Sequence, residues 1–304
     1  MGFLTHDYDL VREFHHSCLG FDITFHFFIQ YFNGIFAFAI FDKKDNKLFI
    51  ARDRFGVKPL YIYQKNNTIA FSSEIKPLIN IENFDSSINY ESIANYLTFL
   101  WSPGSSTMYK YVKKLSPGKV IQIDTRNFRI KYYNTKNTEY FNGDYWDLSE
   151  DEWVKKIDNT LNLAVENQML SDAPLGFFLS GGLDSSLLVA MAKYQKPDQK
   201  LECFTIDQYK ESKGDDFVDD LPYAKKVASY LDVSLNIIDG RADWLTSFDN
   251  MVWQLDEPQA DLAPINVSLI SRFARKTGIK VLLGGTGGDD IFSGYRRHQA
   301  LLIN

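Results

Sequence analysis

A short run of glycines, serines and one aspartate is the part of the chain best suited to chemistry. It follows directly on an apolar stretch and reads Ser180-Gly181-Gly182-Leu183-Asp184-Ser185-Ser186. The two glycines can take backbone angles closed to other residues and let main-chain N–H groups approach an anion. The serines suit the N-cap region of a helix, whose N-terminus adds partial positive charge. Asp184 indicates a bridging Mg²⁺, because a carboxylate cannot bind phosphate directly. The run therefore predicts a phosphate loop rather than a plain turn.

A second glycine-rich run follows another apolar stretch, and it reads Leu283-Gly284-Gly285-Thr286-Gly287-Gly288-Asp289-Asp290. In a doubly wound sheet the carboxyl ends of the strands converge on one ligand edge. We therefore expect Asp289 to share the metal ion with Asp184. On the same edge, Leu179 and Ile206 are expected to form an apolar slot for an adenine ring. The alternative is a flexible glycine turn that precedes a short helix and binds nothing.

The elements that must position these runs alternate in type. Beyond about Asp144, strands are expected at four apolar stretches, residues 175–179, 202–206, 234–238 and 280–283. Between these strands apolar residues recur at helical spacing, which predicts intervening helices. A further amphipathic helix is expected ahead of the first strand, over 152–169. Such alternation predicts a parallel, doubly wound sheet with right-handed crossovers, which brings both glycine runs to one edge.

The first half of the chain has a different pattern of strands and turns. Strands are expected at residues 35–41, 47–51, 60–63, 68–71 and 120–123, with a helical interval near 91–100. Most are joined by short polar turns, which predicts an α+β arrangement of antiparallel layers. The boundary between the two parts is expected between Tyr133 and Ser149, a polar, Asn-rich stretch.

Composition restricts the partners and the compartment. The chain has 304 residues, 45% of them hydrophobic, and a net charge of -6, which disfavours nucleic acid. The basic pairs Lys43-Lys44 and Lys113-Lys114 are expected to be solvated turn residues. Neither Cys18 nor Cys203 forms a C-x-x-C pair, so no disulfide framework or zinc knuckle is expected. No signal peptide or membrane span is recognised, and we expect a cytoplasmic protein.

Several stretches carry a resemblance to one family. The first glycine run, which lacks the Gly-Lys-Ser/Thr of a Walker A loop, resembles the PP-loop of the ATP pyrophosphatases. FNGIFAFAIFD at 32–42, ARDRFGVKPLY at 51–61 and FSSEIK at 71–76 resemble the amidotransferase domain of the glutamine-hydrolysing asparagine synthetases. LSPG at 115–118, YWDL at 145–148 and GGDDIFSGY at 287–295 continue it. The resemblance covers roughly residues 32–300.

The resemblance implies two domains and a reaction. Residues 1–140 would form a partial type 2 glutamine amidotransferase domain, with partial Ntn-type antiparallel β layers. Residues 145–304 would form a doubly wound, parallel-sheet ATP pyrophosphatase domain. In that family the carboxylate of aspartate attacks the α-phosphorus of ATP, giving an acyl-adenylate and pyrophosphate. Ammonia, released from glutamine in the first domain, then displaces AMP. A homodimer is compatible with this organisation.

The resemblance also implies residue roles. It assigns Mg²⁺ to Asp184 and Asp289. It assigns the pyrophosphate contacts to four residues of the first run, Ser180, Gly181, Gly182 and Ser185. It assigns adenine contacts to Leu179, to Ile206 and to the backbone near Gly284 and Gly285.

The sequence departs from the family pattern at three places. The family's nucleophile is a cysteine directly after the initiator methionine, where this chain has Gly2, and Cys18 is no substitute because it is not N-terminal. We therefore expect an inactive glutaminase. The family also continues past the region of Tyr295 to a lysine that contacts the transferring phosphates, which has no counterpart here. Finally, Thr286 stands where the family usually has a glutamate. The identity of the acceptor carboxylate is therefore open, and surface-polysaccharide precursors are among the alternatives to aspartate.

Three hypotheses follow. The chain is a truncated piece of an asparagine-synthetase-like ligase, a working ligase that uses free ammonia, or a nucleotide-binding or interaction protein without turnover. The segment 1–31, including His15-His16, matches no part of the family, and a metal site at these adjacent histidines is disfavoured.

Overall fold

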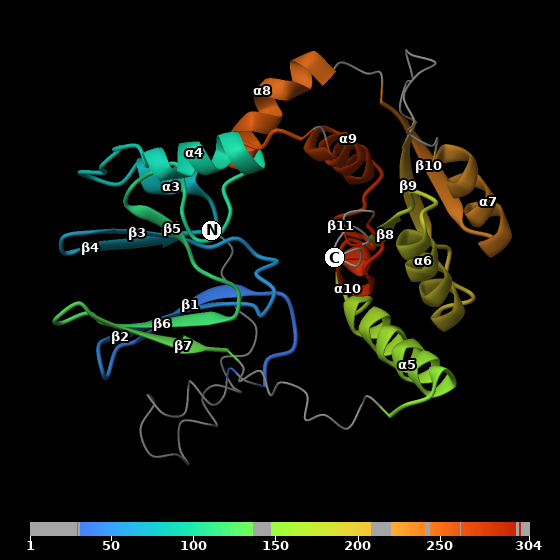
Figure 1. Cartoon of the computed structure of the whole chain (residues 1–304), viewed down its shortest axis with the longest axis horizontal. Helices are drawn as coiled ribbons and strands as arrows, with labels where there is room; N and C mark the ends of the chain where they lie inside the picture. The colour runs from blue at the N-terminus through green and yellow to red at the C-terminus, as the bar shows by residue number, and fades with distance from the viewer. Residues whose placement is uncertain are drawn as a thin grey trace. The chain divides into compact units, whose positions relative to one another are not determined.

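The computed structural model describes residues 29, 31–135, 147–207, 220–240, 244–261, 263–295 and 298. The chain forms two compact units (Figure 1). The first comprises Met1–Asn142 with Leu255–Ala260, and the second comprises Gly143–Gln254 with Asp261–Asn304. The domain limits expected at 140 and 145 lie outside the described residues.

The first unit contains two antiparallel sheets. One has the order β1-β2-β6-β7, formed by Ala37–Asp42, Lys47–Arg52, Lys119–Asp124 and Arg129–Asn134. The other has the order β4-β3-β5, formed by Thr68–Ser72, Tyr61–Lys65 and Val112–Lys114. Among the described residues, the helices α3 (Ile75–Ile79) and α4 (Tyr90–Phe99) accompany these sheets.

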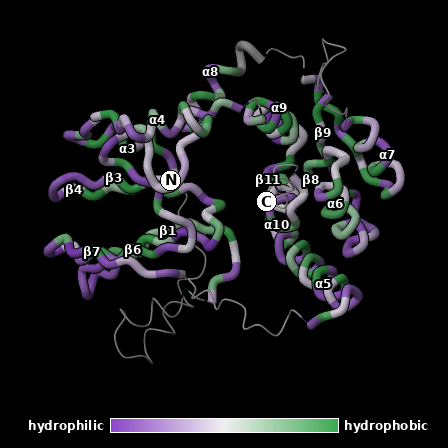
Figure 2. The backbone as a smooth tube through the Cα atoms, in the orientation of Figure 1, coloured by the Kyte–Doolittle hydropathy of each residue, from purple (hydrophilic) through white to green (hydrophobic). Residues whose placement is uncertain are grey.

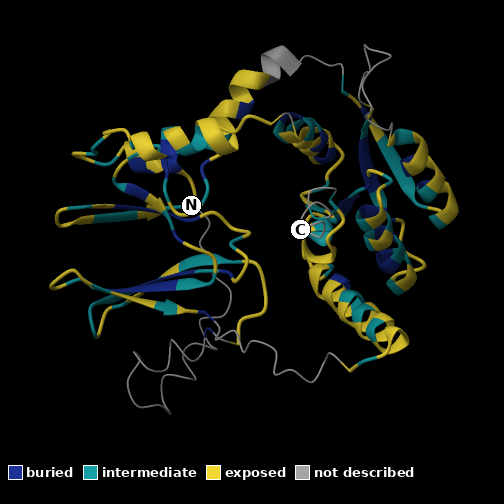
Figure 3. Cartoon of the chain, in the orientation of Figure 1, coloured by how far each residue is buried: buried dark blue, intermediate teal, exposed yellow. Residues whose placement is uncertain are grey.

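One hydrophobic cluster joins these two sheets. Ile50 and Ile121 come from the first sheet and Ile62 from the second, and all three are buried in that cluster. Figure 3 shows buried residues along β2 and β6. Antiparallel strands alternate between faces, and here the opposite faces are covered as well: Phe49 and Ala51 of β2 lie in a second cluster, and Tyr63 of β3 packs with Ile75 and Leu78 of α3 in a third.

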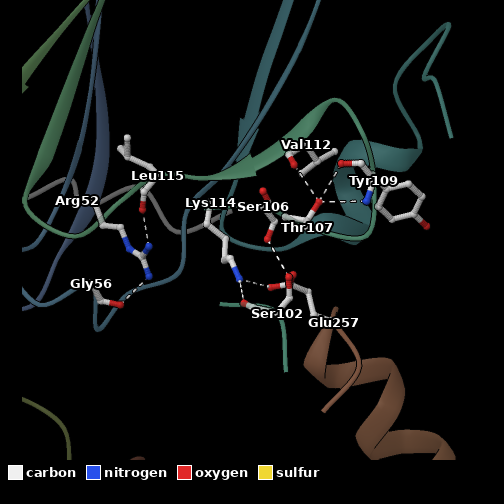
Figure 4. Close-up of polar contacts among 10 residues, drawn as sticks. All are labelled: Arg52, Gly56, Ser102, Ser106, Thr107, Tyr109, Val112, Lys114, Leu115 and Glu257. Carbon is white, nitrogen blue, oxygen red and sulfur yellow. Dashed lines mark hydrogen bonds and ion pairs between the residues drawn. The ribbon is translucent and has the colours of Figure 1, made fainter. Parts of the chain in front are cut away.

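The turn after β2 is held by two charged side chains. The buried Asp53 carboxylate accepts hydrogen bonds from the backbone N–H groups of Phe55, Val57 and Lys58 at 2.9–3.1 Å. The Arg52 guanidinium donates to the carbonyls of Gly56 and Leu115, as Figure 4 shows. These bonds pair backbone groups that would otherwise be orphaned. The turn is thereby tied to Leu115, which directly follows β5.

The second unit is built on a parallel sheet with the order β10-β9-β8-β11. The strands are β8 (Leu175–Phe178), β9 (Glu202–Asp207), β10 (Ser234–Asp239) and β11 (Val281–Leu283). The helices are α5 (Glu150–Gln168), α6 (Leu183–Gln195), α7 (Leu221–Leu231), α8 (Trp244–Leu255), α9 (Ala263–Lys276) and α10 (Gly288–Phe292).

Helices cover both faces of this sheet. On one face Phe177 and Cys203 pack in a cluster with side chains from α5, α6 and α7. On the other face Phe204 packs with Ile270 and Ala274 of α9. Figure 2 shows β8 and β9 as hydrophobic segments, as expected for parallel strands buried on both sides. The predicted fold class, antiparallel layers followed by a doubly wound parallel sheet, is confirmed.

The two basic pairs behave differently. Lys43 and Lys44 are exposed in the turn between β1 and β2, as expected. Lys113 and Lys114 are instead part of β5, and Lys114 is largely buried against Ser102 and Glu257. The expectation of a turn was wrong there, because both residues lie in β5, which pairs with β3. Lys113 is exposed, as expected, whereas Lys114 is not.

Among the described helices, none combines the length and the apolar character needed to cross a bilayer.

Candidate phosphate and metal site

The first glycine run lies between β8 and α6. The helix begins at Leu183 with Gly182 as its N-cap, so neither serine is the capping residue. The hydroxyls of Ser185 and Ser186 donate back to the carbonyl of Gly182 at 3.2 and 2.7 Å, and Ser180 Oγ lies 3.0 Å from Ser185 Oγ. These bonds fix the loop, and they leave the backbone N–H groups of the first helical turn without intrahelical acceptors.

The two glycines of this loop have different structural roles. Gly181 has φ +88, which favours glycine, and a Cβ there would lie 2.5 Å from the backbone nitrogen of Ala224. Gly182 has an ordinary φ of -68, and its Cβ would meet only Ser180 Oγ at 3.4 Å. Gly181 is therefore required where the loop contacts α7, whereas Gly182 leaves the helix N-terminus open to close approach.

The second glycine run meets the first turn of α6. The backbone N–H of Asp289 donates to Asp184 Oδ2 at 3.0 Å, which brings the two predicted metal ligands to one place. A Cβ on Gly288 would lie 2.2 Å from the same oxygen, and one on Gly285 would lie 2.8 Å from the Asp184 backbone carbon. The sequence analysis missed these positioning roles, although the spacing of the glycines ahead of Asp289 was their signal.

These residues fit a magnesium ion. Mg²⁺ is commonly held by one or two carboxylates together with substrate phosphates and waters. The Asp184 carboxylate fills the room that Gly288 leaves and accepts the Asp289 N–H, whereas the Asp289 carboxylate lies beside Gly294. Groups of three or more potential metal ligands are not found in the described part of the chain.

The predicted adenine-contact residues lie near the ends of β8 and β9. Leu179 is fully buried in the core, so only its backbone can reach a ligand. Ile206 is partly buried beside Gly240, and Gly284 is exposed, its nearest neighbour being Phe178. The adenine contacts stay a prediction, with Ile206 the more accessible of the two apolar side chains.

Several predicted positions take no part in the described site. Gly2, His15-His16 and Cys18 lie outside the described residues. Cys203 is buried in β9, and burial raises the pKa of its thiol to about 12. A thiol that stays protonated at neutral pH is not a nucleophile, so Cys203 is a core residue. Thr286 is exposed in the second glycine run.

Comparison with known proteins shows the class of the chain. Residues 156–304 match the family model "Asparagine synthase", and residues 25–134 match the model "Glutamine amidotransferase domain". The two models thus match successive parts of the chain. The chain belongs to the family of the glutamine-hydrolysing asparagine synthetases.

Individual relatives support this assignment. The chain is 34% identical over 268 residues to "Asparagine synthetase [glutamine-hydrolyzing] 1" of Bacillus subtilis, which covers 88% of this chain and 40% of that protein. It is 35% identical over 292 residues to "Putative asparagine synthetase [glutamine-hydrolyzing] 2" of Methanocaldococcus jannaschii, covering 92% and 52%. "Amidase chry2" of Gibberella zeae is 27% identical, covering 90% and 41%. The chain therefore spans about half the length of these relatives, or less.

Proposed function

We propose that this chain carries the ATP-dependent half of an amide ligase. It activates a carboxylate, aspartate in the first instance, by adenylation with release of pyrophosphate, and ammonia then displaces AMP. The observation that carries the proposal is the contact between the two glycine runs, where the Asp289 N–H donates to the carboxylate of Asp184 in the first turn of α6. Family membership supports the use of ATP by a synthetase of this kind.

Each group has a role in this proposal. The β- and γ-phosphates of ATP bind at the N-terminus of α6, where backbone N–H groups and the partial positive charge favour an anion. Ser180 and Ser185 orient phosphate oxygens through their hydroxyls. Asp184 and Asp289 hold Mg²⁺, which when bound neutralises phosphate charge in the transition state. The acceptor carboxylate oxygen attacks the α-phosphorus, and the bond from that phosphorus to pyrophosphate breaks.

The nitrogen donor and the acceptor are separate proposals. The family model of the first part supports glutamine as a source of ammonia in relatives. For this chain we propose ammonia as the nucleophile that displaces AMP, supplied either as ammonium in solution or from glutamine. Thr286, where the resemblance expects glutamate, favours a second candidate acceptor, a carboxylate other than that of aspartate. The relative named as an amidase supports diversity of substrates among similar chains.

The test is pyrophosphate release by the purified chain from ATP and Mg²⁺ with aspartate, with either ammonium or glutamine as donor. Release with ammonium is expected, and release with glutamine as well would show that the first part supplies ammonia. Asp184→Asn should lower the rate by roughly two orders of magnitude, the scale of one lost electrostatic group. Asp198→Asn, a change at an exposed carboxylate away from the loops, is the matched control and should leave the rate unchanged. No release with any of several small carboxylates, despite ATP binding, would contradict the ligase proposal.

A further inference from the structure

The segment that leads into β1 contains an asparagine followed directly by a glycine, Asn33-Gly34. In such a pair the backbone nitrogen of the glycine can attack the side-chain amide carbon of the asparagine, because glycine has no β-carbon to hinder the approach. The sequence holds a second pair, Asn142-Gly143, which lies outside the described residues. Whether the attack takes place depends on the backbone around the pair, and the structure describes that backbone at Asn33.

The attacking nitrogen of Gly34 is accessible in this structure. Asn33 and Gly34 are both exposed, and both lie outside the helices and strands. The Gly34 N–H makes no hydrogen bond to any described residue. Apart from its chain neighbours, no atom lies within 4 Å of the place that a Cβ on Gly34 would occupy. The pair therefore has both the room and the unengaged nitrogen that the attack needs.

Glycine at position 34 is not required by the local structure. Gly34 is not among the glycines with a positive φ, and an added Cβ would meet no neighbour. This differs from Gly181, where both the backbone angle and the contact with Ala224 demand glycine. Gly34→Ala should therefore change the reactivity of the pair while leaving the fold intact.

Two other exposed asparagines of the first unit show what protects such a residue. Asn83 is followed by Phe84, whose N–H donates to the Ile81 carbonyl at 3.3 Å. Asn134 is followed by Thr135, whose N–H donates to the Gly118 carbonyl at 2.7 Å. A backbone nitrogen that already donates a hydrogen bond is held away from the preceding side chain, and a β-carbon on its own residue hinders the approach further. Asn33 has neither form of protection.

The residues on either side of the pair are held in place. The Phe32 N–H donates to the Ile29 carbonyl at 3.1 Å, and the Phe36 carbonyl accepts from the Asp53 N–H at 2.8 Å. The rings of Phe32 and Phe36 lie 5.5 Å apart and nearly perpendicular, an arrangement that stabilises aromatic pairs. The open pair is thus bracketed by two anchored residues, and a change in the length of the backbone between them would disturb their contacts.

We propose that Asn33 is a site of spontaneous deamidation, and that its conversion to isoaspartate loosens the start of β1. The Gly34 nitrogen bonds to Asn33 Cγ and closes a succinimide ring. The bond from Cγ to the side-chain nitrogen breaks, and that nitrogen leaves as ammonia with the proton of the Gly34 N–H. Water then adds to one of the two ring carbonyls and opens the ring. One opening gives aspartate, and the other gives isoaspartate, whose main chain runs through the former side chain. The inference does not depend on the proposed ligase reaction.

Isoaspartate changes the segment in its length and in its charge. It adds one carbon atom to the main chain and one carboxylate where a neutral amide stood. Because Phe32 and Phe36 are anchored on either side, the extra atom is accommodated only if one of their contacts shifts. Phe36 directly precedes β1, which lies at the edge of its sheet among the described strands. An edge strand is paired on one side only, so we expect its hydrogen bonds to β2 to open more often.

Peptide mapping of the whole chain by mass spectrometry, after incubation in mildly alkaline buffer, tests the modification site. The peptide with Asn33 should exchange its side-chain amide for a hydroxyl, and the product should accept a methyl group from an isoaspartyl-specific methyltransferase. Gly34→Ala should slow the conversion by about tenfold or more, because its Cβ hinders the attack. The peptide with Asn83 is the internal control and should stay unchanged. If Gly34→Ala does not fold, as judged by circular dichroism, Asn33→Gln provides the second test, since its longer side chain would have to close a larger ring and should not convert.

Hydrogen–deuterium exchange tests the consequence for β1. Peptides from β1 should exchange about twofold faster or more in the converted chain than in the fresh chain. Asn33→Asp is the matched control, because it adds the charge without the extra main-chain atom, and it should exchange like the fresh chain.

Four results would overturn the inference. If Asn33 stays intact while a synthetic peptide of residues 31–36 converts, the fold protects the pair and the site is refuted. Equal conversion in Gly34→Ala would refute the role of the open glycine. Unchanged exchange of β1 in the converted chain would refute the loosening, and faster exchange in Asn33→Asp would assign it to charge instead of backbone length.

Discussion

Replacing Gly181 by alanine should destabilise the second unit by about 2 to 4 kcal/mol. Two effects contribute. An L-residue at φ +88 costs about 1 kcal/mol relative to glycine. The added Cβ would also lie 2.5 Å from the nitrogen of Ala224 and 2.8 Å from the carbonyl carbon of Tyr223. Overpacking against atoms that cannot rotate away costs about 1 to 3 kcal/mol.

The neighbouring glycine provides the control. Gly182→Ala adds the same methyl group at an ordinary φ of -68, with Ser180 Oγ at 3.4 Å as its nearest neighbour. Alanine at a helix N-cap is less favourable than glycine, so a loss of at most about 1 kcal/mol is expected. The sequence does not distinguish the two glycines, whereas the structure predicts a difference in stability of about 1 to 4 kcal/mol between their variants.

The assay must report on the second unit, because a chain with two units does not unfold in one transition. Native-state hydrogen exchange in increasing urea, read on peptides from β8 and β9, gives the free energy of opening of that sheet. ATP binding, measured by calorimetry, should weaken together with stability in Gly181→Ala. Equal stability of the two variants would refute the geometry assigned to the loop, since the clash with α7 would then not exist.

Three further predictions follow from the same contacts. Asp184→Asn should weaken ATP binding in the presence of Mg²⁺ and have little effect without it, as measured by calorimetry in both buffers; equal affinities with Mg²⁺ would remove this residue from the metal site. Asp53→Ala removes a buried carboxylate that accepts from three backbone N–H groups of an otherwise exposed turn and should destabilise the first unit by about 1 to 3 kcal/mol, measured by exchange on β2 peptides, with Asp45→Ala, in another turn, as control. Burial raises the pKa of the Glu257 carboxyl and outweighs the attraction of Lys114. The stability that this carboxyl contributes is therefore present below its pKa in the unfolded chain and is lost as pH rises through its pKa in the folded chain. Glu257→Gln should therefore gain stability relative to the parent as pH rises from about 4 to about 7, and a relative loss over that range would show that the ion pair dominates.

Much of the second unit could be predicted from its apolar runs. The stretch 202–206 is β9, Glu202–Asp207, and 175–179 is β8, Leu175–Phe178. Strands buried on both faces leave long apolar runs, which are easily recognised. The sequence did not reveal β7, Arg129–Asn134, because an edge strand of alternating basic and aromatic residues resembles a loop. Three-residue β5 was missed for its brevity, and its lysine was misjudged with it.

The residues of the candidate site could be proposed from the sequence, but the contacts that position them could not. Ser180, Asp184 and Asp289 follow from residue type and from the convergence of strand ends. That Gly182 is the N-cap, and that the serines bond back to its carbonyl, depends on where the first helical hydrogen bond forms, which residue type does not fix. The capping of α3 by Asp256, 181 residues away, has no local signal at all. Such contacts are set by tertiary packing.

The register of β11 on β8 brings the two glycine runs together into one structure. Leu283 pairs with Phe177, so β11 and β8 end side by side and each leads into a glycine-rich loop. Gly285 then approaches the first turn of α6 so closely that a Cβ would lie 2.9 Å from the Ser185 nitrogen. Only from there can the Asp289 N–H reach Asp184. The glycines of the second run therefore need not bind a ligand to be required. Their absent side chains allow one loop to orient the Asp184 carboxylate, the predicted metal ligand of the other, and a shift of β11 by one residue would separate the two aspartates with every predicted ligand still present.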